Sequence, residues 1–126
     1  MNLGIKGHNE ISVTKNLLAK NVGSGSLDVF ATPAMLALVE ETAWKSVAPS
    51  LDFGETTVGI SCNMDHTAPS PLGMKITCDT ELTAIDGKKL TFSFTVTDEN
   101  GEIGKGTHER FIVDAKKFQE KANAKK

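Results

Sequence analysis

The feature that most constrains the fold is a strongly apolar helix that precedes a run of alternating strands. Residues 34–39 (Ala-Met-Leu-Ala-Leu-Val) are apolar on every face of a helix, and such a helix is buried within protein rather than lying on a surface. Thr32 can cap this helix with its hydroxyl, and Pro33 suits the first helical position. We therefore predict a buried helix that begins at Thr32 and ends near Pro49.

Four strands are predicted after this helix, over residues 56–66, 74–85, 89–97 and 103–113. The third alternates most cleanly, and its inward side chains are predicted to be Leu90, Phe92, Phe94 and Val96. Asp86-Gly87 and Asn100-Gly101 are hairpin signals. Residues 9–14 alternate weakly and are a candidate for a first strand before the helix. One antiparallel sheet wrapped around one buried helix satisfies both patterns. The sequence thus predicts an α+β fold with the helix on one face of the sheet.

Length and composition indicate one small domain, which we assign to residues 1–126. The net charge of −2 gives no global reason to expect nucleic acid or an acidic membrane as a partner. Cys62 and Cys78 fall in strand-like runs without a C-x-x-C pair, which indicates reduced core thiols. No stretch approaches transmembrane length and no apolar leader is apparent, so we expect a cytoplasmic protein. Residues 115–126 are expected to form a short helix that frays.

His66 is the first candidate for chemistry. It ends the strand over residues 56–66, just before Pro69 and Pro71, which stop a strand. Its parity in the alternation is shared by Val58, Ile60, Cys62 and Met64. The ring is therefore predicted to emerge on the apolar face, partly desolvated but reachable, where a base is useful. The alternative is a core histidine whose nitrogens bond to backbone.

Glu40 directly follows the apolar run inside the predicted helix. Its neighbour Glu41 has Lys45 four positions later, the favourable orientation for an exposed ion pair. We therefore interpret Glu41 as solvated and Glu40 as the inward or interfacial carboxylate. A carboxylate in an apolar setting must be hydrogen-bonded or paired, and a positioned carboxylate can act as a general base. The alternative is a glutamate at the helix edge that reaches solvent.

Three further residues have both a plain and a functional interpretation, and a fourth has only a plain one. For Thr32 the sequence favours a role as the helix cap, although a hydroxyl at the start of a helix can also hold an anion or a water. Gly59 lies inside a strand, where glycine marks a bulge or the close approach of a ligand. Arg110 shares parity with His108 and is either solvated or bound to a carboxylate or phosphate. His108 has no evident helper, which favours a structural or surface role.

Several catalytic signatures do not occur in the chain. It has no G-x-S-x-G elbow, no H-E-x-x-H, no P-loop and no G-x-G-x-x-G fingerprint. No metal-ligand spacing is apparent, and basic residues are not interleaved with aromatic ones, which argues against nucleic-acid binding.

Several segments together are similar to a known family. The quoted segments are 29–33 (Val-Phe-Ala-Thr-Pro), Glu40, 58–59 (Val-Gly), 66–73 (His-Thr-Ala-Pro-Ser-Pro-Leu-Gly) and 104–110 (Gly-Lys-Gly-Thr-His-Glu-Arg). They resemble the hot-dog-fold acyl-CoA thioesterases, specifically the fluoroacetyl-CoA thioesterase group. The resemblance runs from about Ile11 to Phe118. The spacing of the threonine, glutamate and histidine, taken with the glycine-rich string, is what makes it specific.

The resemblance implies a hot-dog fold and a homodimer with the acyl-CoA site between the subunits. It places Thr32, Glu40 and His66 at catalytic positions, Gly59 against the thioester carbonyl and Arg110 near the acyl pocket. Glu40 would be the nucleophile or the base that activates water, and Thr32 would hold Glu40 or the attacking group. His66 would be the general acid/base for the departing thiolate, and the Gly59 N–H would stabilise the oxyanion. No cofactor beyond the CoA of the substrate is implied.

One region departs from the resemblance. Members selective for the fluorinated substrate share a bulky lid that bears a phenylalanine, whereas residues 23–28 here are Gly-Ser-Gly-Ser-Leu-Asp. We therefore expect hydrolysis of a small acyl-CoA without selectivity for a fluorinated group. Two alternatives on the same fold stay open, an acyl-CoA hydratase and a non-catalytic acyl-CoA binding protein.

Overall fold

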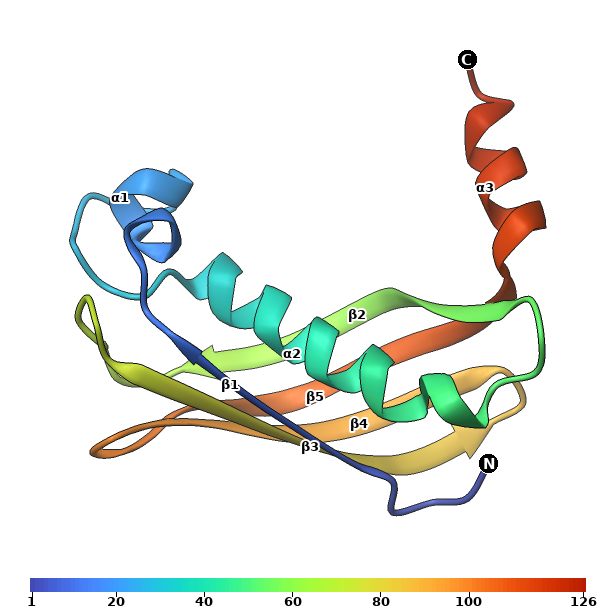
Figure 1. Cartoon of the computed structure of the whole chain (residues 1–126), viewed down its shortest axis with the longest axis horizontal. Helices are drawn as coiled ribbons and strands as arrows, with labels where there is room; N and C mark the ends of the chain where they lie inside the picture. Colours follow the sequence, from blue (N-terminus) through green and yellow to red (C-terminus); the bar gives the residue numbers. More distant parts are fainter.

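The computed structural model describes residues 1–126 and consists of a curved five-stranded sheet with one long helix on its concave face (Figure 1). The strands are β1 (Lys6–Ser12), β2 (Glu55–His66), β3 (Lys75–Asp86), β4 (Lys89–Asp98) and β5 (Gly101–Asp114). The helices are α1 (Ala19–Val22), α2 (Thr32–Val47) and α3 (Ala115–Asn123), with short 3-10 turns at Lys15–Leu17 and Ala48–Ser50. The predicted α+β fold is confirmed.

All neighbouring strands are antiparallel, in the order β1-β3-β4-β5-β2. The predicted hairpins join β3 to β4 and β4 to β5, and Gly87 and Gly101 adopt the positive φ that such turns need. The first strand covers Lys6–Ser12 rather than residues 9–14. β1 and β2 are the two edges of the sheet, so β2 has one unpaired side.

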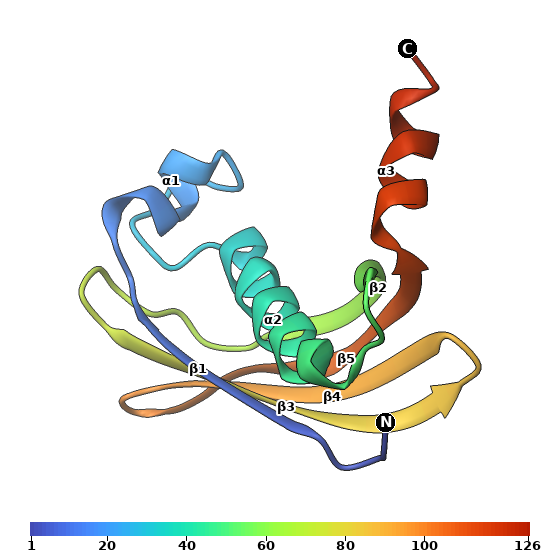
Figure 2. The same ribbon diagram turned by 45° about the vertical axis from the view of Figure 1, so that its right-hand side comes forward.

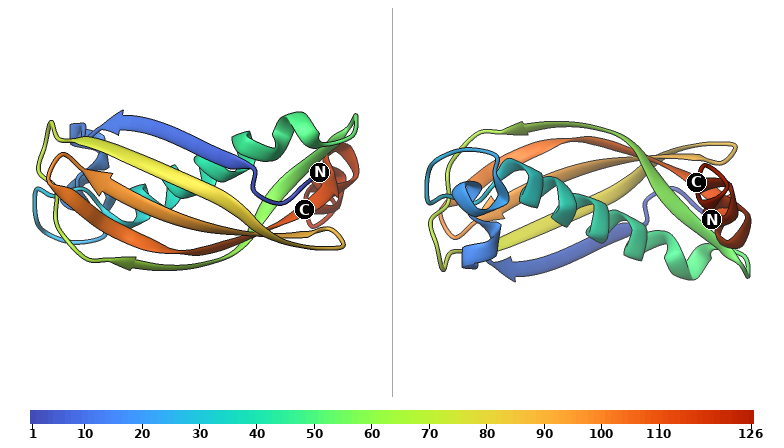
Figure 3. Two further views of the ribbon diagram at one scale, coloured as in Figure 1. Left: turned by 90° about the horizontal axis from the view of Figure 1, so that it is seen from below. Right: turned by 90° about the horizontal axis from the view of Figure 1, so that it is seen from above.

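Helix α2 lies along the length of the sheet, as Figure 3 shows from above and below. Its buried face, which packs on the sheet, consists of Met35, Leu38, Val39, Thr42, Ala43 and Val47. The prediction that this helix is enclosed on every side is wrong for the isolated chain. One sheet can cover only one side of a helix, and Ala37 and Trp44 remain exposed on the other.

Three pairs of strands contain a register shift that the alternation did not reveal, and the shift between β4 and β5 leaves Ile103 without a partner on β4. In β2 the shift lies between Gly59 and Ser61, so Ile60 has no partner on β5 and is exposed. An inserted residue moves every following side chain to the opposite face. Val58 and Ile60 therefore do not share the face of His66, contrary to the prediction. A similar shift in β3 leaves Ala84 exposed instead of inward.

The C-terminal helix α3 projects away from the sheet (Figure 2). The Asp114 side chain caps it by accepting a hydrogen bond from the Lys117 backbone N–H at 2.9 Å. The helix is entirely unburied. No helix in the structure combines the length and apolar character that a membrane crossing requires.

Candidate active site

His66 lies at the end of β2, where the sheet breaks before Pro69. Beyond the bulge its ring shares the inward face with Cys62 and Met64, which pack against the core. The ring meets Phe30 edge-on, with 6.4 Å between ring centroids. Burial lowers the pKa of His66 because a charged ring would lose hydration there. The imidazole is therefore neutral near neutral pH, and its Nε2 is buried without a protein partner.

Thr32 is the partner of this histidine. Its Oγ1 lies 2.8 Å from His66 Nδ1. The predicted helix cap is wrong, because α2 already includes Thr32, and Ala31 occupies the cap position without a side-chain hydrogen bond. Pro33 stands in the first turn, as predicted. The hydroxyl that would have capped the helix is thus free to orient the ring.

Thr32 and His66 line a pocket of about 540 Å³ at this end of the molecule. The other lining residues come from the segment before α2 and the turn after β2, namely Ala19, Ser24, Gly25, Ser26, Leu27, Val29, Phe30, Ala31, Thr67, Ala68 and Pro69. Residues 24–27 of the 23–28 segment therefore form one wall of the pocket. A pocket of this volume lies within the range of small-molecule sites.

Glu40 lies in the middle of α2 and faces the sheet at Gly59 and Arg110. Its Oε2 lies 3.3 Å from Arg110 Nη1. A side chain at Gly59 would overlap that oxygen, so glycine is needed for the carboxylate to reach this place. The Glu40 side chain is 39% exposed and that of Arg110 only 6%. Glu40 is the interfacial carboxylate that the sequence predicts, and Glu41 pairs with Lys45 at 3.0 Å on the surface.

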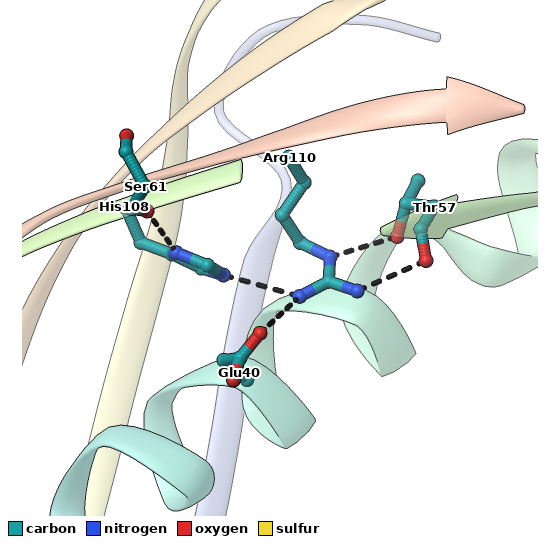
Figure 4. Close-up of polar contacts among 5 residues, drawn as sticks. All are labelled: Glu40, Thr57, Ser61, His108 and Arg110. Carbon is teal, nitrogen blue, oxygen red and sulfur yellow. Dashed lines mark hydrogen bonds and ion pairs between the residues drawn. The ribbon is translucent and has the colours of Figure 1, made fainter. Parts of the chain in front are cut away.

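Arg110 is held by three hydrogen bonds to two residues besides Glu40 (Figure 4). Its Nε donates to Thr57 Oγ1 at 2.8 Å, and its Nη2 donates to the Thr57 carbonyl at 2.9 Å. Its Nη1 also lies 3.2 Å from His108 Nε2. Burial tends to lower the pKa of Arg110 and Glu40 opposes this, but a guanidinium stays protonated in proteins. Of its two predicted interpretations, the carboxylate-binding one is correct, and the carboxylate belongs to the protein itself.

The sequence did not assign His108 a functional position, yet it is 1% exposed and part of this network. Its Nδ1 lies 2.7 Å from the Ser61 carbonyl oxygen. Thr57 and the Ser61 carbonyl were missed as well. The signal that could have found His108 is its parity, because residues two apart on a strand share a face and Arg110 was already a candidate.

The predicted residues thus form two groups in the chain. Thr32 contacts His66 at the pocket, while Gly59 and Arg110 surround Glu40 in the middle of the sheet. The Thr32 hydroxyl bonds to His66 and not to Glu40. Chemically, the first group offers a neutral imidazole beside a hydroxyl, and the second offers a carboxylate oriented by a buried cation. No group of three or more His, Cys, Asp or Glu side chains is arranged to hold a metal ion.

Comparisons with known proteins identify the family to which the chain is similar. The model of the family described as fluoroacetyl-CoA-specific thioesterase matches residues 13–116. The fluoroacetyl-CoA thioesterase of Streptantibioticus cattleyicolor is 37% identical over 98 residues, which cover 78% of this chain and 70% of that protein.

Two solved structures show the same fold. A structure of the fluoroacetyl-CoA thioesterase FlK has a TM-score of 0.93 and 30% identity and covers 100% of this chain and 98% of its own. A hot-dog-like protein from Thermanaerovibrio acidaminovorans has a TM-score of 0.90 at 19% identity, with 99% and 93% covered. The chain has the hot-dog fold and belongs to the fluoroacetyl-CoA-specific thioesterase family.

Proposed function

We propose that this protein hydrolyses a small acyl-CoA thioester to the free acid and CoA. The observation that carries the proposal is the 2.8 Å contact between Thr32 and the neutral His66 at the wall of the pocket. A neutral ring that is buried but reaches a pocket can accept and return a proton. Family membership supports the same reaction.

In the proposed mechanism Glu40 either attacks the thioester carbonyl or removes a proton from the water that attacks it. The carbon–sulfur bond then breaks and the thiolate of CoA leaves; if Glu40 was the nucleophile, water then cleaves the acyl–Glu40 anhydride to the free acid and the carboxylate. On either route neutral His66 accepts the proton released from the attacking water and returns it to the thiolate of CoA, so that Glu40 and His66 end in their starting states. Thr32 orients His66 through its hydroxyl, a role that fits its observed partner. The Gly59 N–H would stabilise the oxyanion, and the loss of one such donor typically lowers the rate by a factor of about 10²–10³. The mechanism needs no cofactor beyond the CoA of the substrate.

We also propose that the active form is a homodimer in which all 126 residues act as one hot-dog domain. Two features of the chain and one rule of symmetry support a second copy as the cover for α2 and β2. The edge strand β2 has an unpaired side over twelve residues, Trp44 and Ile60 are exposed next to it, and a twofold pairing joins equal surfaces. A monomer in size-exclusion chromatography with light scattering would contradict this.

The acyl group is expected to be small, and we expect no selectivity for a fluorinated group, because Ser24, Gly25 and Ser26 line the pocket where a bulky lid would stand.

The free thiols of Cys62 and Cys78 support a cytoplasmic location. The chain offers no reason to expect nucleic acid or a membrane as partner, since its net charge is −2.

The test is thiol release from a panel of short, branched, aromatic and 2-enoyl acyl-CoAs, including acetyl-CoA and fluoroacetyl-CoA. Glu40→Ala and His66→Ala are each expected to lower kcat by at least about 10³. Glu41→Ala, which removes the neighbouring exposed carboxylate, is the matched control and is expected to keep wild-type turnover. Binding without thiol release would favour the non-catalytic alternative, and loss of enoyl absorbance without free thiol would favour the hydratase.

A further inference from the structure

His108 and Arg110 occupy successive inward positions on β5 and lie behind Glu40 (Figure 4). Both are buried, and His108 Nε2 lies 3.2 Å from Arg110 Nη1, which is 3.3 Å from Glu40 Oε2. The same guanidinium nitrogen thus faces the histidine and the carboxylate. A histidine placed so close to an arginine needs a specific protonation state.

The Ser61 carbonyl determines that state. A carbonyl oxygen only accepts, so the 2.7 Å contact requires the hydrogen of the neutral ring to reside on His108 Nδ1. Nε2 then carries a lone pair and accepts from Arg110, whose guanidinium can only donate. Phe92 on β4 stacks on the ring, with 6.2 Å between centroids and 29° between planes. Both the tautomer and the plane of the ring are therefore set by contacts outside the site.

This acceptor completes the orientation of Arg110. Thr57 receives the hydrogen bonds of Nε and Nη2 and so holds one edge of the planar guanidinium. His108 receives one of the two hydrogens of Nη1, which leaves the other directed at Glu40. Without an acceptor at Nε2 of His108, one hydrogen of a buried cation would have no partner, which is costly.

We propose that His108 is a positioning residue of the thioesterase site, whose neutral imidazole accepts from Arg110 and so fixes the N–H that orients Glu40. This inference rests on the role proposed above for Glu40. It assigns a function to a histidine that does not line the pocket.

The same geometry makes the site sensitive to acid. A proton on Nε2 would turn the acceptor into a donor facing Arg110, and the imidazolium would compete with Arg110 for Glu40. The charged or titratable neighbours are Arg110 and Glu109 on β5, Glu40 on α2 and Cys62, the register partner on β2, while β4 contributes only Phe92. Burial lowers the pKa of His108 and so preserves the neutral ring near neutral pH.

Two substitutions separate positioning from mere packing. His108→Gln can place an amide oxygen near the position of Nε2 and keep an acceptor for Arg110. His108→Asn can only donate to the Ser61 carbonyl from the position of Nδ1. We expect kcat to fall about tenfold further in the Asn variant than in the Gln variant, with KM changed less than about twofold. Equal losses in the two variants, or losses that follow their unfolding free energies, would overturn the proposal.

The pH profile supplies a second readout. Protonation of either His66 or His108 is expected to inactivate the enzyme. At a pH below both pKa values, kcat/KM of the wild type should therefore fall by up to a factor of 100 for each unit by which the pH is lowered. In the His108→Gln variant, kcat/KM should fall only tenfold per pH unit. His8→Gln changes an exposed histidine on β1, and its pH profile should match that of the wild type. Identical acid limbs in the wild type and the Gln variant would contradict the inference.

A readout without turnover keeps this inference distinct from the proposed reaction. Nitrogen-15 NMR of the labelled protein should show His108 as the Nδ1–H tautomer at pH 7, and crystal structures should retain the Arg110–Glu40 contact in His108→Gln but not in His108→Asn. A protonated Nε2 at pH 7, or an unchanged contact in the Asn variant, would refute the positioning role. Absence of thiol release from the wild type would instead refute the proposed reaction.

Discussion

Strands β4 and β5 are neighbours in the sheet and alternate with the same period. The inward face of β4 forms part of the hydrophobic core, whereas the inward face of β5 contributes side chains to the candidate site. β4 turns only apolar side chains toward α2, and they are buried: Leu90, Phe92, Phe94 and Val96. β5 places a histidine and an arginine on the same inward side, together with Gly104 and Gly106. Leu90 and Arg110 are even direct register partners. The period of a strand determines which residues face inward, whereas residue type determines whether that face becomes a core or a site.

The largest contrast is expected between substitutions in the two strands, in their effects on the free energy of unfolding and on kcat. Leu90→Ala should lower the free energy of unfolding by about 2–5 kcal/mol through a core cavity, with kcat per folded molecule changed only a few-fold. Arg110→Met should cost about 1–3 kcal/mol, because Thr57 and His108 lose their donor, but should lower kcat by about 10². Urea denaturation and thiol release on the same samples measure both. If Arg110→Met left kcat unchanged, β5 would be a second core strand and the comparison would fail.

Gly59→Ala should sharpen the comparison by displacing the carboxylate without touching β4. A Cβ there would overlap Glu40 Oε2 and lie 3.3 Å from Arg110 Nη1. A shift of about 1 Å at a reacting group can cost about 10² in rate, so kcat should fall by about 10–100-fold.

Gly106→Ala is the contrasting variant for that experiment. A Cβ at Gly106 would overlap the backbone carbonyl of Asn63, so it should impair folding. Circular dichroism and thiol release distinguish the two results. Normal kcat in folded Gly59→Ala protein would show that Glu40 does not need its observed place.

The smallest expected effect is the dependence of the free energy of unfolding on pH. Burial lowers the pKa values of His66 and His108 in the folded protein, so the unfolded chain binds more protons below about pH 6.5. The free energy of unfolding should therefore rise with pH through this window and level off above it. His8 has a raised pKa because it bonds to Asp79 and acts in the opposite direction, so the measurement belongs in a His8→Gln background. A flat curve between pH 5 and 7 would indicate that neither ring is held neutral.

Much of the fold followed from the sequence, for a simple physical reason. Hairpins at Gly87 and Gly101 and the inward residues of β4 depend on local conformation and on period. The interfacial position of Glu40, next to the exposed Glu41–Lys45 pair, followed from the helical period in the same way. These features require no knowledge of distant parts of the chain.

The errors occurred where distant segments meet. The bulge at Ile60 reversed the parity of the residues before it, and no local feature other than Gly59 signals it. Thr32 has the sequence of a helix cap, but the arrival of β2 supplies His66 as its partner. Ser61 contributes a backbone carbonyl to His108, which any residue type could have provided, so its identity carries no signal.

The sequence by itself determined the helix, the strands and the candidates Thr32, Glu40 and His66, because hydrophobic period and residue type act over a few positions. Only the tertiary structure decided which candidates touch. It paired Thr32 with His66, joined Glu40 to Arg110 across seventy residues, and gave His108 the acceptor role that sequence could not assign. Hydrogen bonds and ion pairs depend on distances of about 3 Å, and such distances between remote residues are fixed only when the sheet closes around the helix.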